Sequence, residues 1–149
     1  MGRGLWAVGR GLWAVGCWLR IYFWRMKVES FYDLEVYQLA FEVQQEIFEL
    51  SKHFPKGEAY SLTDPIRRSS RSVGANIAEA WRKRRYPAHF ASKLTDSDGE
   101  NAETQHWLRT AEACEYLNTS SVSALLEKTN TIGAKLGRMI SSPEKWQPK

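Results

Sequence analysis

Arginine residues recur in the segment 63–85 at spacings that place several of them on one side of a helix. At 100° per residue, four of them fall within about 60° of one another: Arg67, Arg71, Arg82 and Arg85. Arg68 lies just to one side, and Gly74 and Ala78 leave the middle of this stripe without bulky side chains. Guanidinium groups about one to two turns apart can bind successive phosphates, so the stripe is a candidate nucleic-acid-binding surface.

Three carboxylates further along the chain, Asp96, Glu100 and Glu103, also fall within about 60° on one face of a helix. An acidic stripe is the simplest partner for the arginine stripe, within one chain or between subunits. If the two meet, the arginines stabilise the structure and the nucleic-acid interpretation weakens. The same carboxylates could instead bind Mg²⁺, because hard cations prefer oxygen ligands. The spacing alone leaves these alternatives open.

Arg84 and His89 have a spacing that resembles the Arg-x4-His motif of a class of helical ribonucleases. In such a pair the arginine holds the phosphate and the histidine acts as acid or base near neutral pH. Here, however, Pro87 breaks the helix between the two residues. The sequence contains no glycine-rich phosphate loop and no Ser/His/Asp or Cys/His nucleophile set. We therefore predict that the protein is not an enzyme and has no catalytic residue, with a ribonuclease as the remaining alternative.

The histidines and cysteines do not suggest a metal site. The three histidines, His53, His89 and His106, do not fall at metal-ligand spacing with any cysteine. The two cysteines, Cys17 and Cys114, are far apart and lack a partner motif, which fits a reducing compartment. We therefore expect a cytoplasmic protein with no disulfide, no metal, no cofactor and no small-molecule substrate.

The formal net charge of +4 comes from the first 25 residues. This segment contains four arginines and no acidic residue, and the rest of the chain has 17 basic residues against 17 acidic ones. The basic isoelectric point therefore does not argue for nucleic-acid binding by the rest of the chain. Any such argument depends on the arginine stripe alone.

The N-terminal segment also contains a perfect tandem repeat. Residues 2–8 read Gly-Arg-Gly-Leu-Trp-Ala-Val, and residues 9–15 repeat them without a change. Arg10 and Arg20 interrupt its apolar stretch, which falls short of the ~20 residues that a membrane helix needs. We expect Met26 to be the natural start, with residues 1–25 a non-native or disordered extension. The alternative is an anchor of tryptophan and arginine on a membrane surface.

Apolar residues at alternating spacings of three and four predict four helices, over about 33–53, 63–85, 88–117 and 120–140. The first shows a heptad seam of Val36, Ala40, Val43, Ile47, Leu50 and Phe54, and Asp33 is a plausible N-cap. Short connections favour antiparallel neighbours. We therefore predict an all-α protein, an antiparallel up-down four-helix bundle over residues 26–142, followed by a flexible tail at 143–149.

The third predicted helix has a polar centre. Its apolar face, marked by Phe90 and Leu108, includes Ser97, Asn101 and Thr104 between them. A wholly dry core is therefore not expected here, because buried polar groups need hydrogen-bond partners. The polar centre, together with the wide apolar face of the first helix, suggests that the bundle is part of a larger assembly.

The chain also resembles a known family through a series of short motifs. They follow in the order Phe31-x-Asp33-Leu34-x-Val36-Tyr37-Gln38, Phe54-Pro55-x-x-Glu58-x-Tyr60-x-Leu62, Arg67-Arg68 and Ser72-x-x-x-Asn76-Ile77-Ala78-Glu79. These motifs resemble the bacterial four-helix-bundle proteins encoded in intervening sequences of large-subunit ribosomal RNA genes. Relatives of that family include the accessory variability proteins of diversity-generating retroelements. The resemblance covers about 31–140.

The resemblance implies a bundle that assembles as a ring-like homopentamer and, in the retroelement branch, binds nucleic acid and a reverse transcriptase. We interpret Asn76 and Glu79 as a structural motif, with Asn76 in a hydrogen bond between helices. Our leading hypothesis is a non-enzymatic oligomer that binds RNA, or DNA, through the arginine stripe and Arg68, and that has no membrane role. The alternative is a protein-interaction scaffold whose arginines pair with acids between subunits.

Overall fold

The computed structural model describes residues 28–148, which form helices and turns and contain no strand. The heptapeptide repeat and the expected start at Met26 lie outside the described residues. The four long helices are α2 (Glu35–Ser51), α3 (Asp64–Lys83), α4 (Pro87–Ala113) and α5 (Thr119–Ile140). None of the helices in this part of the chain is both long and apolar enough to cross a lipid bilayer.

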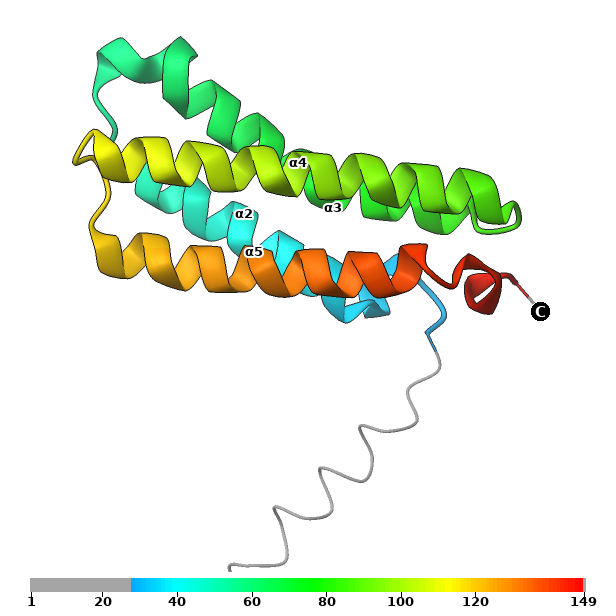
Figure 1. The fold of residues 1–149 in the computed structure, drawn as a ribbon. Coiled ribbons are helices and arrows are strands. Elements are labelled where there is room, and N and C mark those ends of the chain that lie inside the picture. Colours follow the sequence, from blue (N-terminus) through cyan, green and yellow to red (C-terminus); the bar gives the residue numbers. More distant parts are fainter. Residues whose placement is uncertain (1–27, 149) are drawn as a thin grey trace, which may run out of the picture.

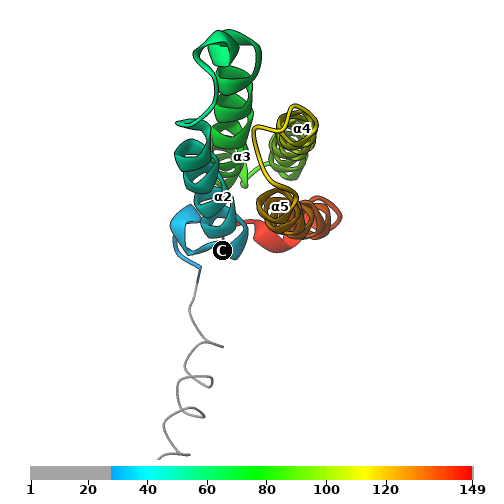
Figure 2. The same cartoon turned by 90° about the vertical axis from the view of Figure 1, so that its left-hand side faces the viewer.

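The four helices pack side by side around one core (Figure 1). Each helix packs on the next one along the chain, and α5 packs back on α2, as the end-on view in Figure 2 shows. The most extensive packing joins α3 to α4. Small buried side chains on α3, including Ser69, Ser70 and Ala80, allow this close approach.

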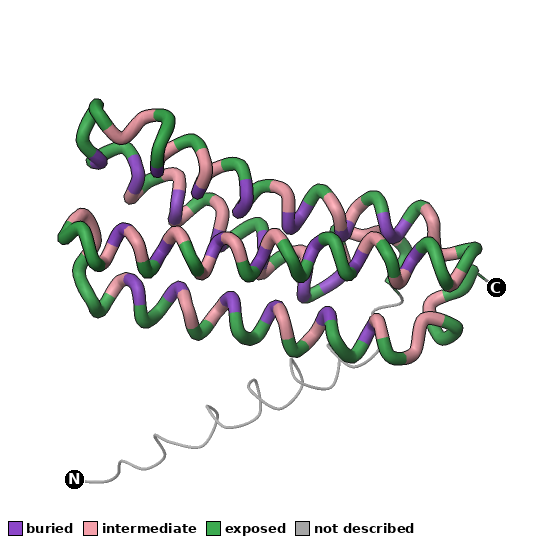
Figure 3. Tube along the Cα trace, turned by 45° about the horizontal axis from the view of Figure 1, so that its top comes forward, coloured by how far each residue is buried: buried purple, intermediate pink, exposed green. Residues whose placement is uncertain are grey.

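The predicted apolar faces form the core, and Figure 3 shows buried positions recurring along each helix. On α2, the seam from Val36 to Ile47 is buried, as predicted. The predicted face of α3, from Leu62 to Trp81, is buried as well. On α5 every predicted face residue is buried: Val122, Leu125, Thr129, Ile132, Leu136 and Met139. Their periodicity is enough to identify these faces because burial of apolar surface is the main force that orients a helix.

The polar centre of α4 is buried and hydrogen-bonded. Ser97 Oγ donates to the carbonyl oxygen of Val73 at 2.9 Å, and Thr104 Oγ1 donates to Ser69 Oγ at 3.0 Å. Asn101 Nδ2 donates to the carbonyl oxygen of Thr129 at 2.9 Å. These bonds attach α4 to both α3 and α5, so the core is polar at its middle.

The start of α2 differs from the prediction. Asp33 is not its N-cap, because Phe31–Asp33 form a 3₁₀ turn that is capped by Ser30. The Asp33 carboxylate accepts hydrogen bonds from the backbone N–H groups of Ser30 and Glu29, at 2.8 and 3.0 Å. Asp33 therefore closes a capping box, and Leu34 precedes α2 without a side-chain cap.

The ends of α3 and α4 also differ from the prediction. A π-helical turn at Ala59–Thr63 runs directly into α3, so Thr63 is already helical and caps nothing. The chain leaves α3 at Lys83, two residues before Arg85. It leaves α4 at Ala113, where Glu115 adopts a left-handed conformation with φ 59°. The backbone N–H groups of the next two residues then bond the Ala111 carbonyl, which ends the helix.

Part of the expected tail at 143–149 forms a turn against the bundle. Pro143–Trp146 form a 3₁₀ turn. The Trp146 ring packs against Trp81 and Phe90, with ring centroids 6.5 and 6.4 Å apart. Burying the large apolar ring of Trp146 against the end of the bundle stabilises this turn. The two prolines in the segment, from which a loose tail was predicted, give no sign of this contact.

Candidate nucleic-acid interface

The helix α3 carries the predicted arginines on the side that faces away from the core. Arg68, Arg71 and Arg82 are exposed, as is Arg85 in the turn after the helix, whereas Arg67 is half-buried. The opposite side of α3 holds buried apolar residues such as Ile66 and Ile77. The helical period therefore separates a basic surface from the core, as the spacing predicted.

The half-buried Arg67 is tied to the neighbouring helix. Its Nε donates a 2.7 Å hydrogen bond to Oγ of Ser51, the last residue of α2, which is 3% exposed. Ser51 Oγ in turn donates to the Phe48 carbonyl oxygen at 3.0 Å. Arg67 thus fixes α3 to the end of α2 and has a structural role as well as a charge.

A phenylalanine of α2 lies beneath the first arginines of α3. The guanidinium carbons of Arg67 and Arg71 lie 5.0 and 5.6 Å from the centroid of the Phe48 ring. Lys52 Nζ lies 4.6 Å from the same centroid. Cations at these distances are attracted to the face of the ring, which restricts their motion and holds the charges near one place.

The middle of the arginine stripe is not bare. Gly74 is buried, and a Cβ atom built on it would lie 3.6 Å from Cε2 of Tyr37. The Tyr37 ring of α2 therefore covers this glycine, so the middle of the stripe is occupied at Gly74. Gly74 thus lies in the packing between α2 and α3.

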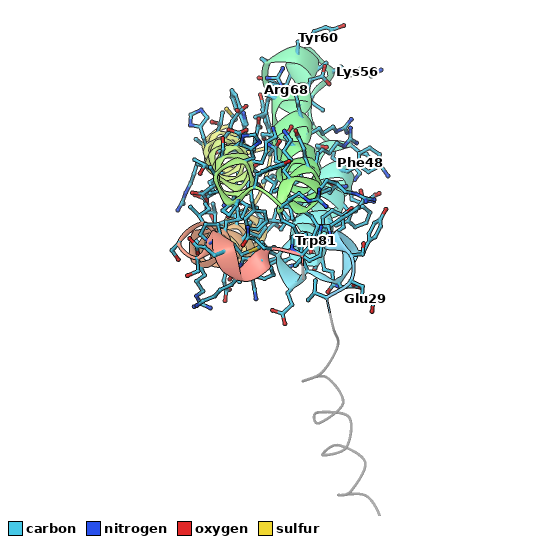
Figure 4. All side chains as sticks on the ribbon, turned by 90° about the vertical axis from the view of Figure 1, so that its right-hand side faces the viewer. Glu29, Phe48, Lys56, Tyr60, Arg68 and Trp81 are labelled. Carbon is cyan, nitrogen blue, oxygen red and sulfur yellow. The ribbon has the colours of Figure 1, made fainter. Side chains whose placement is uncertain are left out.

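The arginines form two groups. Arg67, Arg68 and Arg71, here called the N-terminal arginine group, lie within about one turn of one another. Arg82 lies three turns further on, and Arg85 follows the helix end. The N-terminal arginine group lines an open hollow together with Tyr60, and we call this surface the α3 hollow. Figure 4 shows Tyr60 at the outer tip of this end, with Arg68 beside it and Phe48 on α2.

The five arginines have no ion-pair partner in the described part of the chain. No carboxylate oxygen between residues 28 and 148 lies within 4.0 Å of their guanidinium nitrogens. Asp96, Glu100 and Glu103 therefore do not pair with the arginine stripe within one chain. Arg68 acts on Glu100 only at longer range: burial raises the pKa of that carboxyl, and the charge of Arg68 opposes part of this rise.

The acids of α4 have other surroundings. The carboxylate of Asp96 pairs with Lys93 at 3.2 Å, and Glu103 Oε1 accepts a 3.0 Å hydrogen bond from Trp107 Nε1. Glu100 has no cation within 4.0 Å in the described residues. Burial raises its pKa, and the nearby charges of Glu103 and Asp96 add to the effect. No three metal-ligating side chains gather in the described range, so the arrangement does not support a Mg²⁺ site.

A family profile and a solved structure match this chain. The profile of the 23S rRNA-intervening sequence protein family matches residues 32–138, which is more than half of the chain. The chain belongs to that family. A crystal structure from Bacteroides thetaiotaomicron VPI-5482, described as a protein with unknown function from the S23 ribosomal protein family, is similar, with a TM-score of 0.64 and 27% identity. The match covers 70% of this chain and 97% of that one. No curated protein matches the sequence.

In this member of the 23S rRNA-intervening sequence protein family, Asn76 and Glu79 both contact Lys93 on α4. Lys93 Nζ lies 3.2 Å from Asn76 Oδ1 and 3.0 Å from Glu79 Oε2. Glu79 also pairs with Lys83 at 2.6 Å. Lys83 and Lys93 lower the pKa of Glu79, and Glu79 and Asp96 raise that of Lys93. The two motif residues thus join α3 to α4, through a lysine and not through the polar centre of α4.

The structure does not bring the two residues of the ribonuclease-like pair together. Arg84 stacks on Trp81, with its guanidinium carbon 4.0 Å from the ring centroid, and donates to the Trp81 carbonyl oxygen at 2.6 Å. His89 lies beyond the turn, beside the ring of Tyr86 at 5.6 Å. No hydrogen bond or ring contact joins Arg84 to His89, and both lie in the described range.

The sequence pattern assigns no site role to Lys93, Ser51 or Tyr60, although Tyr60 lies in one of the family motifs. Lys93 precedes Asp96 by three residues, so its ion pair within α4 has a readable signal. Its contact with Glu79 depends on how two helices meet, which no spacing reveals. Tyr60 lies in a turn between helices, where apolar periodicity gives no information.

Proposed function

We propose that this protein is a non-enzymatic RNA-binding protein whose basic surface is the exposed side of α3. The observation that carries this proposal is the set of five arginines that no carboxylate within residues 28–148 neutralises. Keeping such charges unpaired has an energetic cost through mutual repulsion, and a polyanion relieves it. Arginine is also the side chain best suited to bind phosphate in a bidentate geometry.

In this proposal the protein acts in the cytoplasm as a ring-like homo-oligomer, which the family resemblance makes a pentamer. The three-residue connection between α3 and α4, with extensive packing of the two helices, supports an antiparallel up-down bundle as its subunit. A ring would repeat the arginine surface in each subunit. Several weak phosphate-binding surfaces then act together, which raises the overall affinity for one RNA molecule.

A protein-interaction scaffold is the second candidate. Glu100 is half-buried and has no cation within 4.0 Å in the described chain, so an arginine of a second copy could pair with it. In that arrangement the arginines hold the oligomer together. They are then not available to RNA.

One experiment separates the two candidates. RNA binding is measured across a salt series for the wild type and for Arg68→Glu/Arg71→Glu, two exposed arginines, while light scattering records the oligomer size. Arg67 is left unchanged because it is bonded to Ser51. Arg109→Glu, on α4 in an ion pair with Glu112, is the matched control.

If the protein binds RNA through α3, the double variant should lose RNA binding while the oligomer keeps its size. Arg109→Glu should bind RNA nearly as well as the wild type does. Binding should weaken steeply with salt. An oligomer that dissociates in the double variant supports the scaffold instead. The RNA should stay intact throughout, whereas cleavage that disappears in His89→Ala would show an enzyme.

A further inference from the structure

The α3 hollow combines an aromatic ring with arginines. The arginines alone are enough to attract a polyanion, so the ring needs a separate explanation. Tyr60 lines it from the π-helical turn, and the N-terminal arginine group lines it from α3. Two small side chains, Ser72 and Ala75, line the hollow beyond Arg71. The hollow therefore has a basic part and an aromatic part next to each other.

The Tyr60 side chain is exposed to solvent. It is 88% exposed, more than any other large hydrophobic residue in the described chain. Its side chain makes no hydrogen bond or ring contact within the described residues. An aromatic ring stabilises a fold when it is buried, so Tyr60 contributes little to folding. The turn that carries it is a π-helix, a conformation that occurs frequently at functional sites.

We propose that the α3 hollow binds single-stranded RNA, with one base stacked on the Tyr60 ring and the adjacent phosphates on Arg68 and Arg71. The inference rests on the proposed RNA-binding function and specifies the class of RNA. Stacking on an aromatic ring beside a basic groove is how single strands are bound without strict sequence preference.

The chemistry of the Tyr60 ring is the reason for proposing a single strand and not a duplex. In a duplex the faces of the bases are stacked on one another, and a protein reaches the phosphates, the 2′-hydroxyls and the base edges. An exposed ring gains nothing from that surface. A base that is free to turn outward offers its whole face to Tyr60.

The arginines are already placed for phosphates. Phe48 holds Arg71 by a ring contact at 5.6 Å, and Arg68 lies three residues earlier, about 4.5 Å along the helix axis. Asp64 also lines the hollow, one turn before Arg68. Its negative charge repels phosphate, so the phosphates should lie towards Arg71.

The test compares one RNA strand of about 12 nucleotides, without self-complementarity, with its duplex. Binding is measured for the wild type, Tyr60→Ala, Tyr60→Phe and Arg68→Glu/Arg71→Glu. Tyr32→Ala is the matched control, because Tyr32 is 62% exposed and lies outside the hollow. Circular dichroism checks that each variant folds, and a polyglutamate peptide of equal charge is the competitor.

We expect Tyr60→Ala to weaken single-strand binding at least about fivefold, from the loss of one stacked base. Duplex binding by Tyr60→Ala should stay within about twofold of the wild type, because a duplex offers no base face to the ring. Single-strand binding by Tyr60→Phe and Tyr32→Ala should also stay within about twofold, because both variants keep an aromatic ring at position 60. The double arginine variant should lose both ligands.

Equal binding of the single strand by Tyr60→Ala and the wild type overturns this inference and leaves the proposed function standing. An equal loss for strand and duplex overturns it as well. A wild type that binds neither RNA overturns both proposals. If polyglutamate displaces the RNA at equal charge, the hollow belongs to an acidic protein and the inference fails.

Discussion

Two arginines of α3, one turn apart, have different roles. Arg67 donates to the buried Ser51, whereas among residues 28–148 the side chain of Arg71 has a contact with the Phe48 ring and no hydrogen bond. A hydrogen bond from a charged donor to a buried acceptor contributes more to stability than an exposed cation on a ring. A charge that looks equivalent in the sequence is therefore structural at one position and available to a ligand at the other.

Replacing Arg67 should destabilise the fold, and replacing Arg71 should not. We expect Arg67→Ala to lower the free energy of unfolding by about 1.5–3 kcal/mol and Arg71→Ala by less than about 1 kcal/mol. Urea unfolding followed by circular dichroism measures both. In a double-mutant cycle, Ser51→Ala added to Arg67→Ala should cost little more. Equal losses for the two arginines would contradict these roles.

At the residue scale, the sequence predicted which side of α3 is basic but not what each arginine contacts. The helical period is a local property, and it places Arg68 and Arg71 on the exposed side correctly. The partner of Arg67 is 16 positions away on another helix. Such a contact depends on how α2 and α3 pack, so it could not be predicted from spacing.

At the scale of single helices, Gly74 shows that packing between α2 and α3 is close but not maximal. A Cβ atom placed on Gly74 would lie 3.6 Å from the Tyr37 ring and 4.0 Å from the Gln44 amide oxygen, which are ordinary contacts. A glycine inside a helix costs conformational entropy that alanine does not. Alanine at this position should therefore fit.

We expect Gly74→Ala to raise the free energy of unfolding by about 0.5–1 kcal/mol. Gly99→Ala, where nothing lies within 4 Å on the outside of α4, should give a similar gain and serves as the control. Chemical denaturation of the three proteins checks this. If Gly74→Ala destabilises while Gly99→Ala stabilises, the Tyr37 ring cannot tolerate the added methyl group.

Ion pairs with lysines join α2 and α5 at their outer edge. Lys128 Nζ lies 2.6 Å from Glu42 Oε1 and also bonds Glu46, and Lys135 Nζ lies 2.5 Å from Glu35 Oε2. The hydrogen bond and charge of Lys128 lower the pKa of Glu42 below its usual 4.5, and Lys135 does the same for Glu35. The hydrogen bonds of Glu42 and Glu46 raise the pKa of Lys128 above its usual 10.5.

The pairs should make stability depend on pH at both extremes. A lowered carboxyl pKa adds stability above the usual value of 4.5, which is lost as the pH falls through the lowered pKa. A raised lysine pKa adds stability below 10.5, which is lost as the pH rises through the raised pKa. We expect Lys128→Gln to lose less stability than the wild type between about pH 7 and about pH 3, by under about 1 kcal/mol for these exposed groups. Unfolding at a series of pH values measures this, and identical profiles would contradict it.

Among the elements, those with long apolar faces were predicted well and those without one were not. The buried faces of α2, α3 and α5 follow directly from a spacing of three and four. The π-helical turn before α3 and the capping box of Ser30 and Asp33 have no such periodicity. Their conformations are decided by backbone hydrogen bonds and by contacts that a periodic pattern does not contain.

At the scale of the whole molecule, the described chain presents two kinds of surface. The α2–α5 side pairs its lysines with glutamates, whereas the outer side of α3 leaves its arginines unpaired. The chain beyond residue 25 has a net charge near zero, and this total hides the difference between the two surfaces. The sequence could indicate the basic side by helical spacing, but only the folded chain shows that the acids of α4 do not neutralise it.

The salt dependence of RNA binding tests the central claim most directly. Each phosphate contact by a single strand adds about 0.7 to the slope of log affinity against log salt concentration. We predict that Arg68→Gln and Arg71→Gln each reduce the slope by about 0.7, while Arg109→Gln on α4 leaves it unchanged. The same slope in the wild type and in all three variants would contradict the assignment of phosphate binding to the exposed arginines of α3.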